Sequence, residues 1–152
     1  MSELNVRVVK LDPMRVASAH GFGANPEEQS WKKLFDWARE KGLLDNPQAH
    51  RYFGFNNPNP SPGSPNYGYE EWMTVGPEVE AGGEVKIKNM SGGLYAVTRW
   101  ENIPNPQIWQ QLVLWRENSP YKAAHHQWLE ECFNPLDPLD KLIFDLYLPI
   151  AE

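Results

Sequence analysis

Two adjacent pairs of glutamates beside aromatic residues are the side chains whose type and spacing best suit chemistry. They are Glu70-Glu71, followed by Trp72, and Glu130-Glu131, followed by Cys132-Phe133. A carboxylate among rings can pair with an organic cation, and each desolvated ring adds about 0.5 to 2 kcal/mol through cation–π contact. It can also act as a general base toward a positioned water, or as an acid when protonated. The residues alone do not choose among the four acids, and an exposed helical carboxylate is the plain alternative for Glu130 and Glu131.

Other reactive side chains lack the spacing that a metal site or a nucleophile needs. His125 and His126 are adjacent, so on a helix they would point about 100° apart, and no third ligand has fitting spacing. Cys132 is the single cysteine, and no base partner is evident for a catalytic thiol. A phosphate-binding loop and a dinucleotide fingerprint are both missing from the sequence. We therefore predict that the protein binds no metal and no cofactor.

The amino-acid composition excludes some classes of binding partner. The chain has 152 residues, 41% hydrophobic and 22% charged, which fits one globular domain spanning residues 1–152. Its net charge of −6 is the wrong sign for clamping phosphates, so we expect no direct nucleic acid binding. No apolar run is long enough for a membrane span, and the first ten residues do not read as a signal peptide. We expect a cytoplasmic protein whose 7 Trp, 6 Tyr and 6 Phe favour flat cations, although many of these rings must be core.

The same pattern of elements occurs twice. β-rich runs at Val6–Lys10 and Arg15–Ala19, and again at Val85–Lys88 and Leu94–Thr98, each read as a hairpin. Asn25-Pro26 and Asn105-Pro106 then predict helix starts with an Asn cap and Pro at the first helical position.

Spacing supports a duplication. Trp31 and Trp109 are 78 residues apart, as are Trp37 and Trp115, and apolar residues follow each leading Trp at helical spacing. Each half ends in a predicted strand, 69–75 and 144–150, that shares the order aromatic, acid, any residue, aromatic. The halves run from about 4 to 76 and from about 84 to 150. The Pro- and Gly-rich segment 56–66 is a long loop, either a plain surface connection or the rim of a pocket.

This order of segments resembles the GyrI-like (gyrase-inhibitor-like) effector-binding domain. The most specific segments are Tyr67–Val75, Gly92–Val97, Trp128–Glu131 and Asp145–Ile150. The family forms the small-molecule-binding part of multidrug-responsive bacterial transcription regulators and also exists as stand-alone proteins. This chain begins at the first predicted strand, so we expect the stand-alone form without a helix-turn-helix.

The resemblance implies an α+β fold of two βαββ units related by pseudo-two-fold symmetry. An antiparallel sheet would carry two long helices on one face, and a central cleft would have an acid at its floor. Glu131 matches the family's acid, which precedes an aromatic by two residues, and Tyr147 matches the tail aromatic and would hydrogen-bond Glu131. Glu130, Glu71 and Glu70 stay open as the cleft acid. The resemblance suggests further ligand-binding rings at Trp31 or Phe35 on the first helix, at Phe55, at Tyr69 or Trp72, and at Trp109 on the second helix. Glu71 is a further candidate, because alternation along the strand sends one acid of the pair Glu70-Glu71 to each face.

Three functions follow from the resemblance. The first is binding of an aromatic, cationic or amphiphilic small molecule in the ring-lined cleft. The second is an enzyme, because some stand-alone relatives hydrolyse cyclopropane-containing xenobiotics; Glu131 and Tyr147 would then be catalytic. The third is inhibition of a target enzyme through a protein partner.

Overall fold

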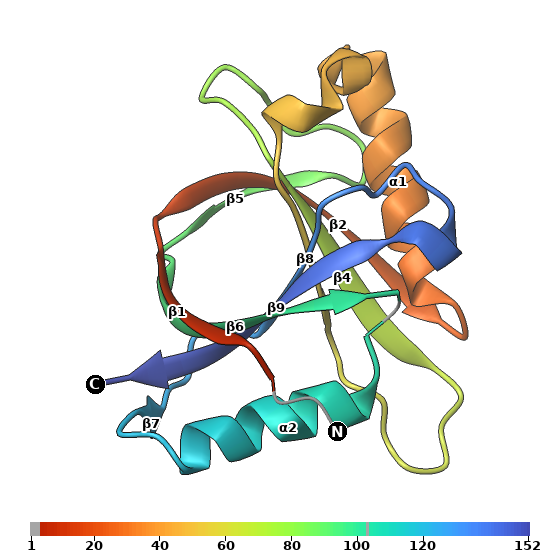
Figure 1. Ribbon diagram of the computed structural model, residues 1–152. Helices are drawn as coiled ribbons and strands as arrows, with labels where there is room; N and C mark the ends of the chain where they lie inside the picture. The colour runs from red at the N-terminus through yellow and green to blue at the C-terminus, as the bar shows by residue number, and fades with distance from the viewer. Residues whose placement is uncertain (1–3, 103) are drawn as a thin grey trace. The chain divides into compact units, whose positions relative to one another are not determined.

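The computed structural model describes residues 4–102 and 104–152, which divide into two compact units (Figure 1). The continuous unit is Met14–Met90. The discontinuous unit joins Met1–Pro13 to Ser91–Glu152. Each unit has its own helix and its own run of antiparallel strands, so each is described separately.

The continuous unit is built as strand, helix, strand, strand, with a further strand at its end. Its strands pair antiparallel in the order β3-β4-β2-β5. Two short 3-10 turns follow the helix, at Leu43–Asp45 and Pro47–Ala49. The elements are β2 (Met14–Gly23), α1 (Pro26–Glu40), β3 (Tyr52–Asn56), β4 (Tyr67–Thr74) and β5 (Lys86–Met90).

The discontinuous unit repeats this plan with a strand taken from the start of the chain. Its strands pair antiparallel in the order β8-β9-β6-β1, and a two-residue strand, β7, pairs with the end of β9. A 3-10 turn at Leu139–Lys141 precedes β9. The elements are β1 (Val6–Leu11), β6 (Gly93–Glu101), α2 (Pro106–Glu117), β7 (Lys122–Ala123), β8 (Leu129–Cys132) and β9 (Ile143–Ala151).

The two units share one topology. β2-α1-β3-β4 corresponds to β6-α2-β8-β9, and β5 pairs with β2 as β1 pairs with β6. Each is a βαββ unit with one added edge strand, which confirms the α+β class and the repeat that the sequence predicts.

The predicted hairpins are wrong. β1 pairs with β6 rather than with the adjacent β2, and β5 pairs with β2 rather than with the adjacent β6. The link after β1 is Asp12-Pro13, and the negative φ of proline does not suit the tight turns that join hairpin strands. The link before β6 contains Gly92 at φ +73°, where a Cβ would collide with the carbonyl oxygen of Leu11. The chain therefore passes from one unit to the other at both links.

Both helices begin where the sequence predicts, but only one uses its cap. The Asn105 Oδ1 accepts a hydrogen bond from the Ile108 backbone N–H at 3.1 Å, whereas the Asn25 side chain makes no capping hydrogen bond to α1. Pro26 and Pro106 occupy the first turns, as expected. The predicted cap chemistry is therefore confirmed for α2 and wrong for α1.

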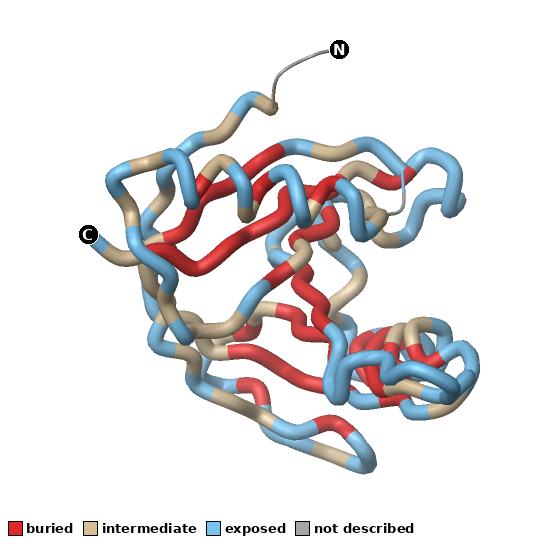
Figure 2. The backbone as a smooth tube through the Cα atoms, turned by 90° about the horizontal axis from the view of Figure 1, so that it is seen from below, coloured by how far each residue is buried: buried red, intermediate tan, exposed pale blue. Residues whose placement is uncertain are grey.

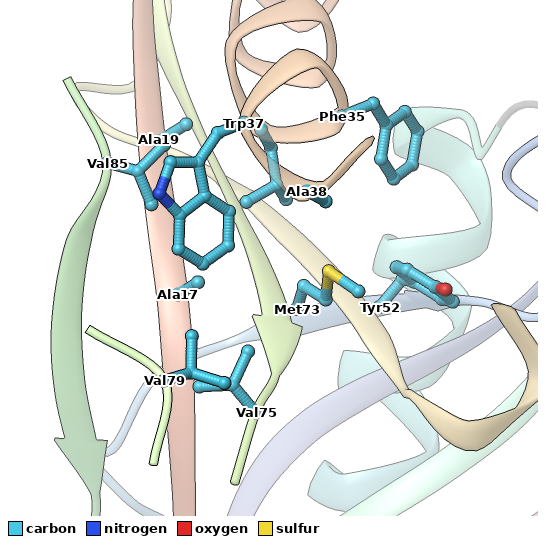
Figure 3. Close-up of a cluster of buried hydrophobic side chains, with 11 residues drawn as sticks. Ala17, Ala19, Phe35, Trp37, Ala38, Tyr52, Met73, Val75, Val79 and Val85 are labelled. Atoms are coloured by element: carbon cyan, nitrogen blue, oxygen red, sulfur yellow. The ribbon is translucent and has the colours of Figure 1, made fainter. Parts of the chain in front are cut away.

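The core of the continuous unit lies between α1 and its sheet (Figure 3). Ala17, Ala19 and Met73 are fully buried under Leu34 and Ala38 of the helix. Trp37 is also part of this cluster, and Trp31 packs against it with partial exposure. Small residues on β2 let the helix approach, because a large side chain there would hold it off the sheet.

Burial follows the elements along the chain (Figure 2). Buried residues concentrate in the strands and on one side of each helix, whereas loop 56–66 is exposed throughout. Among the described residues, no helix is long and apolar enough to cross a membrane.

Candidate functional site

Four carboxylates are buried among the described residues. Their residues retain between 1% and 3% of their surface, and they lie on β4, β8 and β9. Burial of a carboxylate is costly unless donors or cations compensate it. The partners of each acid therefore indicate its role. The four are Glu70, Glu71, Glu131 and Asp145.

Glu131 lies on β8 and is held by a tyrosine of β9. The Tyr147 hydroxyl donates to Glu131 Oε1 at 2.6 Å, so the predicted hydrogen bond is confirmed. The strand register places Leu129 opposite Tyr147, so Glu131 reaches its partner diagonally on the same face. Tyr147 meets Tyr95 edge to face, with ring centroids 5.3 Å apart. The alternative of an exposed helical carboxylate is wrong for Glu131, because the chain forms a strand here and buries it.

Asp145 is the direct cross-strand neighbour of Glu131 and is neutralised by two arginines. Arg7 donates to its Oδ2 and Arg99 to its Oδ1, both at 2.7 Å. Like charges opposite one another destabilise a sheet. The two guanidinium groups relieve this repulsion, and the arrangement leaves an acidic face with its own counter-charges.

Glu70 of the continuous unit occupies the place that Asp145 has in the discontinuous unit. Glu70 is opposite His20 and Phe55, as Asp145 is opposite Arg99 and Glu131. Both closing strands share the sequence order aromatic, acid, any residue, aromatic. The structure explains the acid in this order physically. In both copies the acid is buried and bound by cations or donors of neighbouring strands.

Four side chains donate to the Glu70 carboxylate. Oε2 accepts from Lys88 at 2.6 Å and from Trp72 Nε1 and Ser18 at 2.7 Å, and Oε1 accepts from Asn57 at 3.2 Å. Burial raises the pKa of Glu70, but these four hydrogen bonds outweigh it, so the pKa lies below its ordinary value. Glu70 is therefore ionised at neutral pH, and it fixes the Trp72 indole.

Glu71 points to the other face of β4, toward the α1 side. It is opposite Gly54 on β3. A Cβ on Gly54 would collide with both Glu71 Oε1 and the Tyr69 hydroxyl. The missing side chain at residue 54 therefore makes room for the two polar groups to converge over the strand.

The predicted aromatic positions form separate pairs within the units. In the continuous unit Trp31 lies 4.8 Å from Phe35, and Phe55 lies 4.8 Å from Trp72, measured between ring centroids. Phe35 also contacts Tyr52 within the α1 core. In the discontinuous unit Trp109 pairs with Trp128 at 5.3 Å, a partner that sequence reasoning did not name.

A surface hollow of about 760 Å³ lies elsewhere, between α1 and the turn at Gly82–Val85. Its lining contains the charged outer face of α1, with Lys32, Lys33 and Lys41, and none of the four buried acids. The buried carboxylates and their partners are the stronger sign of specific chemistry, because polar groups are buried only at a cost.

Sequence reasoning missed Asp145 and gave Glu70 only as an alternative acid. The repeated acid in the two closing strands was a usable signal, because it is the same position in both copies. The cationic partners were not predictable, since Arg7 lies 138 residues from Asp145.

Comparison with known proteins agrees with this architecture. The sequence matches the family described as integron-associated effector binding protein, Cass2, over residues 7–150. No curated protein matches the sequence significantly. The C-terminal domain of EcmrR is similar in structure, with a TM-score of 0.71 and 11% identity over 98% of this chain and 98% of that chain. In the EcmrR–DNA complex, this chain spans 57% of the EcmrR chain, with a TM-score of 0.69 and 12% identity over 97% of this chain.

Two further solved structures share the fold. A hydrolase from Listeria innocua has a TM-score of 0.70 and 9% identity over 99% of this chain and 94% of that chain. SAV2435 bound to tetraphenylphosphonium has a TM-score of 0.52 and 9% identity over 97% of this chain and 94% of that chain. The fold and the family match agree with the GyrI-like resemblance, and the chain belongs to the integron-associated effector-binding protein family.

Proposed function

We propose that this protein binds an aromatic or amphiphilic organic cation and that Glu131 pairs with its charge. The observation that carries the proposal is the buried carboxylate of Glu131, held at 2.6 Å by Tyr147 beside the ring of Tyr95. A desolvated carboxylate next to flat π-faces suits a large, weakly hydrated cation, because such a cation loses little hydration on burial.

Two further facts support this ligand class. The family is described as effector binding, and SAV2435, which shares the fold, has been solved with the lipophilic cation tetraphenylphosphonium. The net charge of −6 attracts cations at low ionic strength and disfavours direct nucleic acid contact. The further predicted positions, Trp31, Phe35, Phe55, Tyr69, Glu71, Trp72 and Trp109, stay predictions. Phe35 and Glu71 lie on the α1 face of their sheet, whereas Trp72 lies on the opposite face with Glu70.

The test is a calorimetric titration with tetraphenylphosphonium at low ionic strength. We expect binding by the wild type and a loss of at least about tenfold in affinity for Glu131→Gln, which keeps the size of the side chain and removes its charge. Glu130→Gln is the matched control, because Glu130 is adjacent and points to the other face of β8. Equal binding by Glu131→Gln and the wild type would rule out Glu131 as the anchor.

The same pair of groups supports a second candidate, hydrolytic opening of a cyclopropane conjugated to a carbonyl. Glu131 would take a proton from water, whose oxygen attacks a cyclopropane carbon. The strained C–C bond breaks and its electrons pass to the carbonyl oxygen. The Tyr147 hydroxyl stabilises the resulting enolate, and Glu131 returns the proton that it took from water to the enolate carbon. Mass spectrometry should then show a product heavier by one water. Turnover should vanish in Glu131→Gln while circular dichroism shows a folded protein, and normal turnover would exclude this role.

A further inference from the structure

Arg99 on β6 is a cation that the chain itself supplies to the acidic face around Glu131. Its Nε donates to Asp145 Oδ1 at 2.7 Å, and its guanidinium lies over the Phe133 ring, 4.6 Å from the centroid. Asp145 is the cross-strand partner of Glu131. Phe133 follows Glu131 by two residues. Arg99 thus contacts a ring and a carboxylate that both adjoin Glu131.

The electrostatics agree with this placement. The hydrogen bond to Asp145 is the largest cause that raises the pKa of Arg99, and the negative charges of Asp145 and Glu131 raise it further against the opposing effect of burial. The interaction is mutual, so the charge of Arg99 also acts on Glu131.

Arg7 provides a natural comparison. It donates to the other oxygen of Asp145 at the same distance, 2.7 Å, and its side chain is about as exposed, 49% against 52% for Arg99. It lies on β1, which is one strand further from β8 than β6 is. The two arginines therefore share a carboxylate partner but differ in their distance from Glu131.

We propose that Arg99 is a specificity-determining residue that competes with the ligand as a built-in cation on this face. Arg99 already lies over a ring face that is flanked by carboxylates. These are the surroundings that the proposed function provides for an organic cation. The charge of Arg99 therefore weakens the binding of cations and leaves neutral molecules of the same shape unaffected. This inference rests on the proposed function.

The test compares Arg99→Gln with Arg7→Gln in the full chain. Each variant loses one positive charge at Asp145, so the long-range field changes equally. The two probes are tetraphenylphosphonium and the neutral triphenylphosphine oxide, titrated calorimetrically at low ionic strength. We expect Arg99→Gln to bind tetraphenylphosphonium about fivefold more tightly than the wild type, and Arg7→Gln to stay within about twofold. Affinity for the neutral probe should be the same in all three proteins.

The outcomes separate this inference from the proposed function. Tetraphenylphosphonium binding that depends on Glu131 but is unchanged or weaker in Arg99→Gln overturns the inference alone. An equal gain in Arg7→Gln, or an equal gain for the neutral probe, overturns it as well. The absence of tetraphenylphosphonium binding in every protein overturns the proposed function together with it. Arg99→Lys keeps the charge and should bind as the wild type does, and thermal melts verify that each variant is folded.

Discussion

Glu70 shows at the scale of one residue how donors decide the state of a buried acid. Its four donors come from β2, β4, β5 and the loop after β3. Because these donors keep the pKa in the folded protein below the ordinary value of 4.5, the ionised form binds them best. The stability that these hydrogen bonds give the folded protein is therefore complete above the pKa of Glu70 in the unfolded chain. It is lost as the pH falls through the lower pKa of Glu70 in the folded protein.

Glu70→Gln should expose this contribution in thermal melts measured between about pH 7 and pH 3. We expect a loss of about 1 to 3 kcal/mol near neutral pH, because Gln cannot replace an ionised acceptor for Lys88 and Trp72. The loss should shrink as the pH falls and the wild-type carboxylate takes up a proton. The exposed Glu101→Gln serves as the control. A difference from the wild type that stays constant with pH would contradict the assigned cause.

At the scale of elements, the two Asn-Pro helix starts offer a matched pair. Asn105→Ala should cost about 1 kcal/mol of unfolding free energy, because the Ile108 N–H loses its acceptor. Asn25→Ala should cost clearly less, because that side chain makes no capping bond. Urea unfolding of both variants measures the two costs side by side. Equal losses would show that the Asn25 side chain has a role in stability that the structure does not explain.

Local chemistry made the helices and closing strands predictable. Pro26 and Pro106 fix the first turn of each helix, and Trp31 and Trp109 follow at the same distance from these prolines to within two residues. Strand pairing was not local. β1 finds its partner at β6, and nothing in the β-rich runs distinguishes that partner from β2.

The candidate site also has a part that could be predicted from the sequence and a part that could not. Glu131 and Tyr147 are 16 residues apart on strands that pair directly, so the family resemblance was enough to predict their hydrogen bond. Asp145 needs Arg7 and Arg99, and Glu70 needs Ser18 and Lys88. Those partners come from strands whose pairing the sequence misassigned, which is why both networks escaped prediction.

At the scale of the whole molecule, the duplication keeps the fold and changes the chemistry. Phe55 and Glu131 occupy equivalent positions, since Phe55 is opposite Glu70 and Glu131 is opposite Asp145. One copy carries a ring where the other carries an acid. A few such replacements on an unchanged sheet are enough to give two units of the same topology different side-chain chemistry at equivalent positions.

β1 and β5 each come from one half of the sequence repeat but pair with a strand of the other half. This pairing also determines which stretch of chain can fold alone. The core under α1 includes Val79 and Val85, with Ile87 of β5 packed against it. A fragment of residues 14–90 contains all of them, whereas residues 4–76, the half that the repeat suggests, contains none and leaves β2 without β5. Full burial of an aliphatic side chain is worth about 1.5 to 3 kcal/mol, so the loss of these contacts is comparable to the whole stability of a small domain.

We therefore expect fragment 14–90 to show a cooperative urea transition and dispersed amide resonances, and fragment 4–76 to show neither. Val85→Ala in the longer fragment should shift that transition to lower urea, because it opens a cavity beneath Trp37 and Ala38. A cooperative transition in fragment 4–76 would mean that β1 can pair with β2 when β6 is absent. The topology would then be set by competition between partners rather than by the links at Pro13 and Gly92.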